Sequence, residues 1–256
     1  MMSNDTFLSR TEFAAGRYRH AAQFAQYAIA QNPDSAAAWQ MLGKSLMQVS
    51  DYIGAIDALE HASLLQPLDN ADRISLAIAY GAIGRTSLSR DLLMAVATSD
   101  RIETLDLLQI ATGLEAIDEP RLAMEACRQA GQLSPDSAEV HYQMGHYAQQ
   151  CGHPVNVGEA LIRHAIGLDP DNVHYRIGLS SMLIRLGRKF EAVAVIDRII
   201  PAKLDQVTCL CCLKRIANLF FDCDDLERAK QCAERIATLT AKSPESKVLE
   251  ISESDS

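Results

Sequence analysis

Apolar residues between Ser35 and Asn70 recur at the spacing of an α-helix in two successive runs. They are first Trp39, Leu42, Leu46 and Val49, and then Tyr52, Ile56, Leu59 and Leu64. Small residues stand where two helix backbones must come close, at Gly43, Ala55 and Ala62. Pro67 ends the second run, because proline lacks an amide proton and disfavours helical geometry in the residue before it. The stretch therefore predicts two short amphipathic helices joined by a tight turn.

The same pattern returns along the chain with a constant period. Pro33, Pro67 and Pro135 are separated by 34 and 68 residues. Alanines occupy the same two positions before each proline, at Ala21 and Ala28, Ala55 and Ala62, and Ala123 and Ala130. One period of 34 residues is one helix pair, so the sequence predicts a stack of such pairs.

This unit resembles the tetratricopeptide repeat family, whose period is 34 residues with two helices per repeat. The resemblance rests on Trp39, Leu42, Gly43, Tyr52, Ala55, Ala62 and Pro67, and in-phase copies cover nearly the whole chain. It implies an all-α solenoid of about seven antiparallel helix pairs, wound as a right-handed superhelix. Because the motif residues are packing residues, the resemblance does not identify a ligand.

The repeat predicts one solenoid over residues 5–241, followed by an acidic, serine-rich tail at 242–256 that we expect to be disordered. The expected pairs lie near 5–35, 36–69, 70–103, 104–137, 138–170, 171–204 and 206–241. The third pair departs from the pattern, with Ser89 and Val96 in place of alanines and Arg101 in place of proline.

Two turns carry further expectations. Pro170 follows Pro135 by 35 residues, so one extra residue is expected in the turn at 153–156. Asp118 is expected to cap the helix that begins at Pro120, where a missing amide proton costs little.

The net charge of −9 over 256 residues argues against nucleic acid and anionic membranes as main partners, since both require a basic face. No stretch has the apolar character of a signal peptide or a membrane span. Seven cysteines are an odd number without the spacing of a secreted disulfide framework. We therefore expect a cytoplasmic protein with reduced thiols.

Catalytic motifs are missing from the sequence. It has no glycine-rich phosphate loop, no His-Glu-x-x-His and no nucleophile elbow, so neither an enzyme nor a cofactor is predicted. Five cysteines cluster near the C-terminus, at Cys209, Cys211, Cys212, Cys223 and Cys232. Cys209, Cys212 and Cys223 are conceivable zinc ligands, but a second Cys-x-x-Cys knuckle is missing and buried cysteine packs as an apolar residue. The sequence therefore favours packing over metal binding.

A third use of these cysteines, as a catalytic thiol, is disfavoured. A reactive thiolate needs a positive environment, whereas Asp222, Asp224 and Asp225 flank Cys223 with negative charge.

In the family, the first helices of successive repeats line a concave groove. Projected on this chain, that groove comprises Gln40, Lys44, Met47, Ile74, Ile78, Leu108, Thr112, Tyr142, His146, His174, Ile177, Arg185 and Asn218. Apolar side chains in a groove are typical of a binding surface. The competing interpretation is that the protein's own packing covers Ile74, Ile78 and Leu108.

The histidines and tyrosines of this set also allow two interpretations. Tyr142 and His146 share a helix face, and the repeat register places His174 on the adjacent helix. Either they form a recognition patch for a peptide, or Tyr175 packs between repeats and the histidines are solvated. A transition-metal site at His146 and His174 is disfavoured because the register supplies no third ligand.

These features predict a non-enzymatic scaffold or adaptor that binds a peptide or helix of a partner protein in its groove. The alternative is self-assembly into homo-oligomers through the end helices, for example around Phe7 to Ala15. The Lys, Asn and Arg clamp with which related repeat proteins hold chaperone tails is absent, because Thr6, Arg10, Met41, Ala71 and Ser75 occupy the corresponding region.

Overall fold

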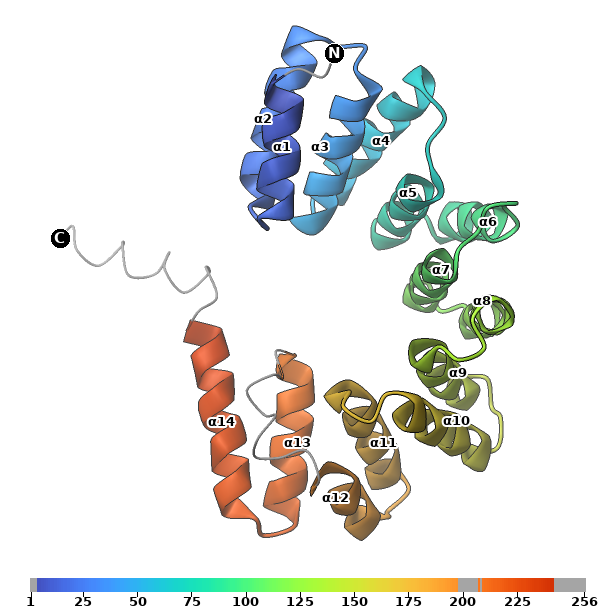
Figure 1. The fold of residues 1–256 in the computed structure, drawn as a ribbon, viewed down its shortest axis with the longest axis vertical. Helices are drawn as coiled ribbons and strands as arrows, with labels where there is room; N and C mark the ends of the chain where they lie inside the picture. The colour runs from blue at the N-terminus through green and yellow to red at the C-terminus, as the bar shows by residue number, and fades with distance from the viewer. Residues whose placement is uncertain (1–3, 198–206, 208, 242–256) are drawn as a thin grey trace, which may run out of the picture. The chain divides into compact units, whose positions relative to one another are not determined.

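The computed structural model of the chain describes residues 4–197, 207 and 209–241. Within these residues the regular elements are fourteen α-helices and no strands, joined in antiparallel pairs by short turns (Figure 1). This confirms the predicted all-α class and its about seven helix pairs. The expected tail at 242–256, and the expected end of the sixth pair near 204, lie outside the described residues.

The helices belong to two compact units, and the single solenoid expected over residues 5–241 stays a prediction. Unit 1 comprises the described residues up to 135, with 150–152, and unit 2 comprises 136–149 and the described residues from 153 onward. The helices of unit 1 are α1 (Asn4–Ala14), α2 (Tyr18–Gln31), α3 (Ala36–Gln48), α4 (Tyr52–Leu65), α5 (Asn70–Ala82), α6 (Thr86–Ala97), α7 (Thr104–Ala116) and α8 (Pro120–Leu133). Those of unit 2 are α9 (Ala138–Gln150, whose last residue groups with unit 1), α10 (Val155–Leu168), α11 (Val173–Arg185), α12 (Lys189–Asp197), α13 (Leu210–Asp222) and α14 (Leu226–Ala241).

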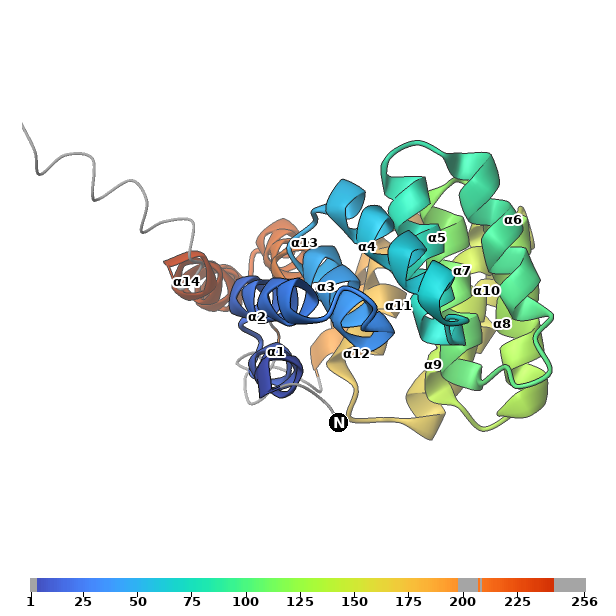
Figure 2. The ribbon, with the colours of Figure 1, turned by 90° about the horizontal axis from the view of Figure 1, so that it is seen from above.

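Small residues let the paired helices approach closely, as their register predicts. Ala55 and Ala62 of α4 are fully buried, and so are Ser89 and Val96 at the equivalent positions of α6. A Cβ atom on Gly43 of α3 would lie 2.6 Å from Cγ of Leu59, which leaves no room for a side chain there. The third pair, α5 and α6, is thus a helix pair like its neighbours despite its departures from the pattern (Figure 2).

The turn inside each pair contains one residue with a left-handed backbone. These residues have φ between +60° and +83° and are Gly16, Ser50, Gly84, Asp118, Gly152, Gly187 and Asp224. The first five are spaced at the 34-residue period. Most turns have three residues between the helices, but the turn between α9 and α10 has four, 151–154, which agrees with the expected extra residue.

Helix starts are fixed by side-chain caps at several repeats. Ser35 accepts a hydrogen bond from the Ala38 amide, and Asp51 and Asp69 accept in the same way from the amides of Gly54 and Asp72. The sequence predicts Asp118 as the cap of α8, but this expectation is wrong: Glu119 is the N-cap residue and Asp118 occupies the left-handed position of the turn.

A core cluster of unit 2 lies between α11 and its neighbours in that unit. Its fully buried side chains include Leu183, Leu213 and Phe220, and it also contains Ile177 and Cys212 near the N-terminal ends of α11 and α13. The core therefore fixes where these two helix ends lie relative to each other.

Candidate functional site

In unit 1 the expected groove residues lie on α3, α5 and α7, but several are not open to solvent. Ile74 and Leu108 are only 1% and 8% exposed. Ile78 is partly buried, and its Cγ1 would lie 3.2 Å from a Cβ placed on Gly113 of α7. The apolar middle of the expected groove is thus filled by the protein's own side chains.

These residues are buried because the first helix of a pair is surrounded by several other helices. Helix α5 packs against α3, α4, α6 and α7, so most of its circumference faces other helices. A shift of one residue turns a side chain by about 100° around the helix. Ile74 and Leu108 therefore point into contacts between neighbouring helices, which corrects the expectation that they line an open wall.

The remaining predicted groove residues of unit 1 differ in their exposure and in the contacts that they already make. The ammonium of Lys44 lies 2.9 Å from Oδ1 of Asp72, so it is already paired. Met47 packs against the core cluster of α4 and α5. Gln40 is partly buried, and Thr112 is exposed with its hydroxyl donating to the Leu108 carbonyl.

In unit 2 the structure brings Tyr142 and His174 together, as the register predicts. The Tyr142 ring centroid lies 5.0 Å from that of His174 and 4.8 Å from that of Tyr175. Gly178 of α11 gives the ring its place, because a Cβ there would collide with the Tyr142 hydroxyl. Burial raises the pKa of Tyr142 to about 12, so its phenol stays protonated at neutral pH.

Tyr175 has the structural role that one interpretation assigned to it. It is buried, and its hydroxyl donates to Glu139 at 2.9 Å. Burial, with this carboxylate, raises its pKa above the ordinary value. His146 and His174 are exposed, so both remain accessible.

The remaining predicted residues of unit 2 divide between core and surface. Ile177 is only 2% exposed and belongs to the core, which corrects its placement in an open groove. Arg185 is exposed and donates to Oε1 of Gln149 on α9 at 2.8 Å. Asn218 is exposed on α13.

A pocket of about 320 Å³ opens at the N-terminal ends of α11 and α13. Its wall combines polar groups and thiols with apolar side chains, from Asp171, Asn172, Val173, His174, Ile177, Val207, Cys209 and Cys212. Of these, His174 and Ile177 also belong to the groove predicted from the sequence.

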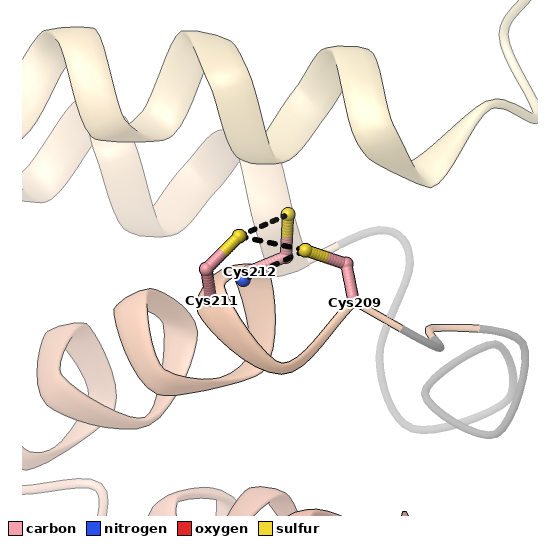
Figure 3. A group of neighbouring side chains, drawn as sticks. All are labelled: Cys209, Cys211 and Cys212. Atoms are coloured by element: carbon pink, nitrogen blue, oxygen red, sulfur yellow. Dashed lines mark hydrogen bonds between the residues drawn. The ribbon is translucent and has the colours of Figure 1, made fainter. Parts of the chain in front are cut away.

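Three cysteines meet beside this pocket at the start of α13. The sulfur atoms of Cys209, Cys211 and Cys212 point toward one another and all lie within 4.8 Å (Figure 3). Cys223, which the sequence grouped with Cys209 and Cys212, follows the opposite end of α13 as its C-cap. The sequence places Cys211 in the cysteine cluster but does not single it out as a conceivable zinc ligand, although the tight Cys-x-Cys-Cys spacing is a signal for it.

The thiols of this cluster differ in their electrostatics. Hydrogen bonding from the Cys211 thiol, and from the Cys212 amide, lowers the pKa of Cys209 to about 7. Burial raises the pKa of Cys212 to about 12. Cys209 is therefore the more acidic of these two thiols.

No protein-family model and no curated protein sequence matches the chain. Solved structures do match. PilF of Pseudomonas aeruginosa superposes with a TM-score of 0.58 at 16% identity, over 85% of this chain and 97% of that one. MamA from Desulfovibrio magneticus RS-1 gives a TM-score of 0.56 at 14% identity, over 66% and 98% of the two chains.

A third match is human IFIT1, solved as a dimer with the capped RNA m7Gppp-AAAA. It has a TM-score of 0.62 at 13% identity, over 87% of this chain and 55% of that one. The chain has a tetratricopeptide-like repeat fold. At these identities the likeness shows the fold alone. Among the described residues, no helix has the length and apolar character that crossing a bilayer requires.

Proposed function

We propose that the protein is a non-enzymatic scaffold that binds a peptide or helix of a partner protein. The proposed contact surface, here called the odd-helix face of unit 2, consists of Tyr142, His146, His174, Arg185, Asn218 and Phe221. The corresponding part of unit 1 retains two polar residues, Thr112, which is exposed, and Gln40, which is partly buried.

The observation that carries this proposal is an exposed aromatic side chain on α13. Phe221 is 65% exposed, and Lys214 and Asn218 precede it by seven and three residues on the same helix face. An accessible aromatic ring among polar groups is the composition expected at the centre of a protein–protein contact.

Neighbouring contacts hold parts of this face in place before any partner arrives. Tyr142 is packed between His174 and Tyr175, and Arg185 is held by Gln149. Side chains that are already ordered lose less conformational entropy on binding. The net charge of −9 favours a neutral or basic partner segment.

A comparison of two phenylalanines tests the proposal. Phe190 on α12 is 93% exposed and lies on a second helix of its pair, so it serves as the matched control for Phe221. Partners captured from the native host by the wild-type protein should be lost with Phe221→Ala/Asn218→Ala and kept with Phe190→Ala. Equal capture by both folded variants would remove the odd-helix face as the binding surface.

The same samples address RNA, because one protein of this fold was solved with a capped RNA. Nuclease treatment before capture should leave the recovered partners unchanged if they are held by protein contacts. Loss of all partners after nuclease treatment would replace the protein ligand with a nucleic acid.

Self-assembly is a second candidate, favoured by the first helix pair. Phe7 of α1 and Tyr27 of α2 are 64% and 61% exposed, whereas the buried side chains of α1 are Thr6 and Ser9. An apolar surface of this kind suits contact with a second copy. Light scattering over a range of concentrations tests it: association should depend on Phe7, and a strict monomer eliminates this candidate.

A further inference from the structure

The start of α13 holds a set of ligand atoms that packing does not explain. Cys127 and Cys232 are fully buried and behave as small apolar residues. Cys209 and Cys211 are exposed, and their sulfur atoms lie 2.7 Å apart. The sulfur of Cys212 lies 4.0 Å from that of Cys211. Three thiols therefore converge at a place where two of them gain nothing from burial.

A fourth donor from another helix borders this group on the side of Cys212, and its side chain would have to rotate toward Cys209 and Cys211 to complete the set. Nδ1 of His174, in the first turn of α11, lies 3.9 Å from the sulfur of Cys212. The Tyr142 ring packs against the same imidazole in an edge-to-face arrangement, with ring centroids 5.0 Å apart. The repeat register does not supply this contact, since His174 and Cys212 are separated by 38 residues rather than 34.

We propose that Cys209, Cys211, Cys212 and His174 bind one Zn²⁺ ion per chain. In a tetrahedral zinc site with Zn–S bonds of about 2.3 Å, ligand atoms lie roughly 3.5–4 Å apart. The distances of Cys212 to Cys211 and to His174 already match this separation. The close pair of Cys209 and Cys211 must open by about 1 Å, which rotation of two exposed side chains allows.

The donor set also selects the class of metal. Three thiolates with one imidazole suit zinc, whereas magnesium and calcium prefer oxygen ligands. The adjoining pocket, whose wall includes His174, Cys209 and Cys212, gives an ion access from solvent. Bound metal would link the N-terminal ends of α11 and α13, two neighbours within unit 2.

Cobalt binding to the reduced full-length protein, prepared without oxygen and stripped with a chelator, tests the proposal. Co²⁺ should produce a thiolate-to-metal charge-transfer band and the strong visible bands of tetrahedral coordination, saturating at one ion per chain. Zn²⁺ should then displace Co²⁺ and raise the melting temperature by several degrees, because it binds the folded state.

Variants locate the site. Cys209→Ser/Cys212→Ser should lower Co²⁺ affinity more than about 100-fold, beyond the usual effect of losing an outer-shell partner. His174→Ala should lower it at least about tenfold and leave the charge-transfer band in place. The matched controls are Cys223→Ser on the same helix and His146→Ala on α9, and both should bind as the wild type. Circular dichroism checks that each variant keeps its helices.

Three outcomes overturn the proposal. The first is the absence of a charge-transfer band in the reduced wild-type protein. The second is unchanged affinity in His174→Ala or in Cys209→Ser/Cys212→Ser. The third is thiol counting that finds Cys209 and Cys211 joined in a disulfide under reducing conditions, with no metal bound.

Discussion

Lys44 of α3 places its ammonium nitrogen 2.9 Å from Oδ1 of Asp72, a carboxylate that is fully buried at the start of α5. The pair joins the first helices of two successive repeats. Burial raises the pKa of Asp72, and the ammonium of Lys44 opposes that rise. The ion pair is therefore what keeps a charged carboxylate tolerable at this position.

Removing the Lys44 ammonium should destabilise the folded protein. Lys44→Met leaves Asp72 buried without a counter-charge and should lower the free energy of unfolding by about 3 kcal/mol. Lys44→Met/Asp72→Asn should recover most of this loss, because no charge then remains buried. Urea denaturation of the two variants, Asp72→Asn alone and the wild type measures the coupling, and simple additivity of the single substitutions would contradict it.

Exchanging serine and glycine at the left-handed turn positions of the second and third repeats should change stability in opposite directions. Ser50 has φ of +61°, which costs a residue with a Cβ about 1 kcal/mol, so Ser50→Gly should stabilise the protein by up to about that amount. Gly84 has φ of +83°, and no atom of the described residues would lie within 4 Å of a Cβ added there. Gly84→Ser should therefore destabilise the protein through the backbone alone. Thermal melts check both signs.

Replacing either of two glycines of the fifth repeat by alanine should also change stability in opposite directions. A Cβ on Gly145 would lie 2.6 Å from Cγ1 of Ile162 and 2.9 Å from the Gly158 carbonyl, so Gly145→Ala should cost roughly 1–3 kcal/mol. Gly167 in α10 has open space around it, so Gly167→Ala should stabilise by about 0.5–1 kcal/mol through helix propensity. Equal effects in chemical denaturation would refute the close contact of α9 and α10.

Stability of unit 2 should depend on pH through Glu159. Its carboxylate lies 2.6 Å from Arg188 and 2.8 Å from Arg163, and Glu191 also pairs with Arg188. The hydrogen bond from Arg188, followed by that from Arg163, lowers the pKa of Glu159. A lowered pKa contributes stability above the unfolded value of about 4.3, which is lost as pH falls through the folded value.

Melting temperatures of the wild type and Glu159→Gln should therefore differ at neutral pH and converge below about pH 4. The difference should also shrink in high salt, because the pair is near the surface. A constant difference across this range would mean that Glu159 acts through packing rather than charge.

The repeat could be predicted from sequence because its packing residues are local and periodic. Gly43 and Ala55 lie in one helix pair and meet across a short turn, so their spacing alone implies the contact. The extra residue of the fifth repeat was predictable for the same reason, since a proline on each side fixes the count.

Burial of the groove residues could not be predicted in the same way. Whether Ile74 or Leu108 faces solvent depends on a rotation of one residue around the helix and on how closely the next helix packs. The meeting of His174 with Cys212 was also hidden, because the spacing between α11 and α13 departs from the repeat period.

The left-handed residues of the turns show the period of the repeat along the chain. Five of them, from Gly16 to Gly152, recur every 34 residues and so occupy equivalent positions in successive repeats. Deleting the 34 residues that follow Ser50, up to and including Gly84, would join equivalent positions of two successive repeats. The architecture can thus be shortened by whole periods, whereas a deletion that removes part of a helix would change the register between the helices on either side of it.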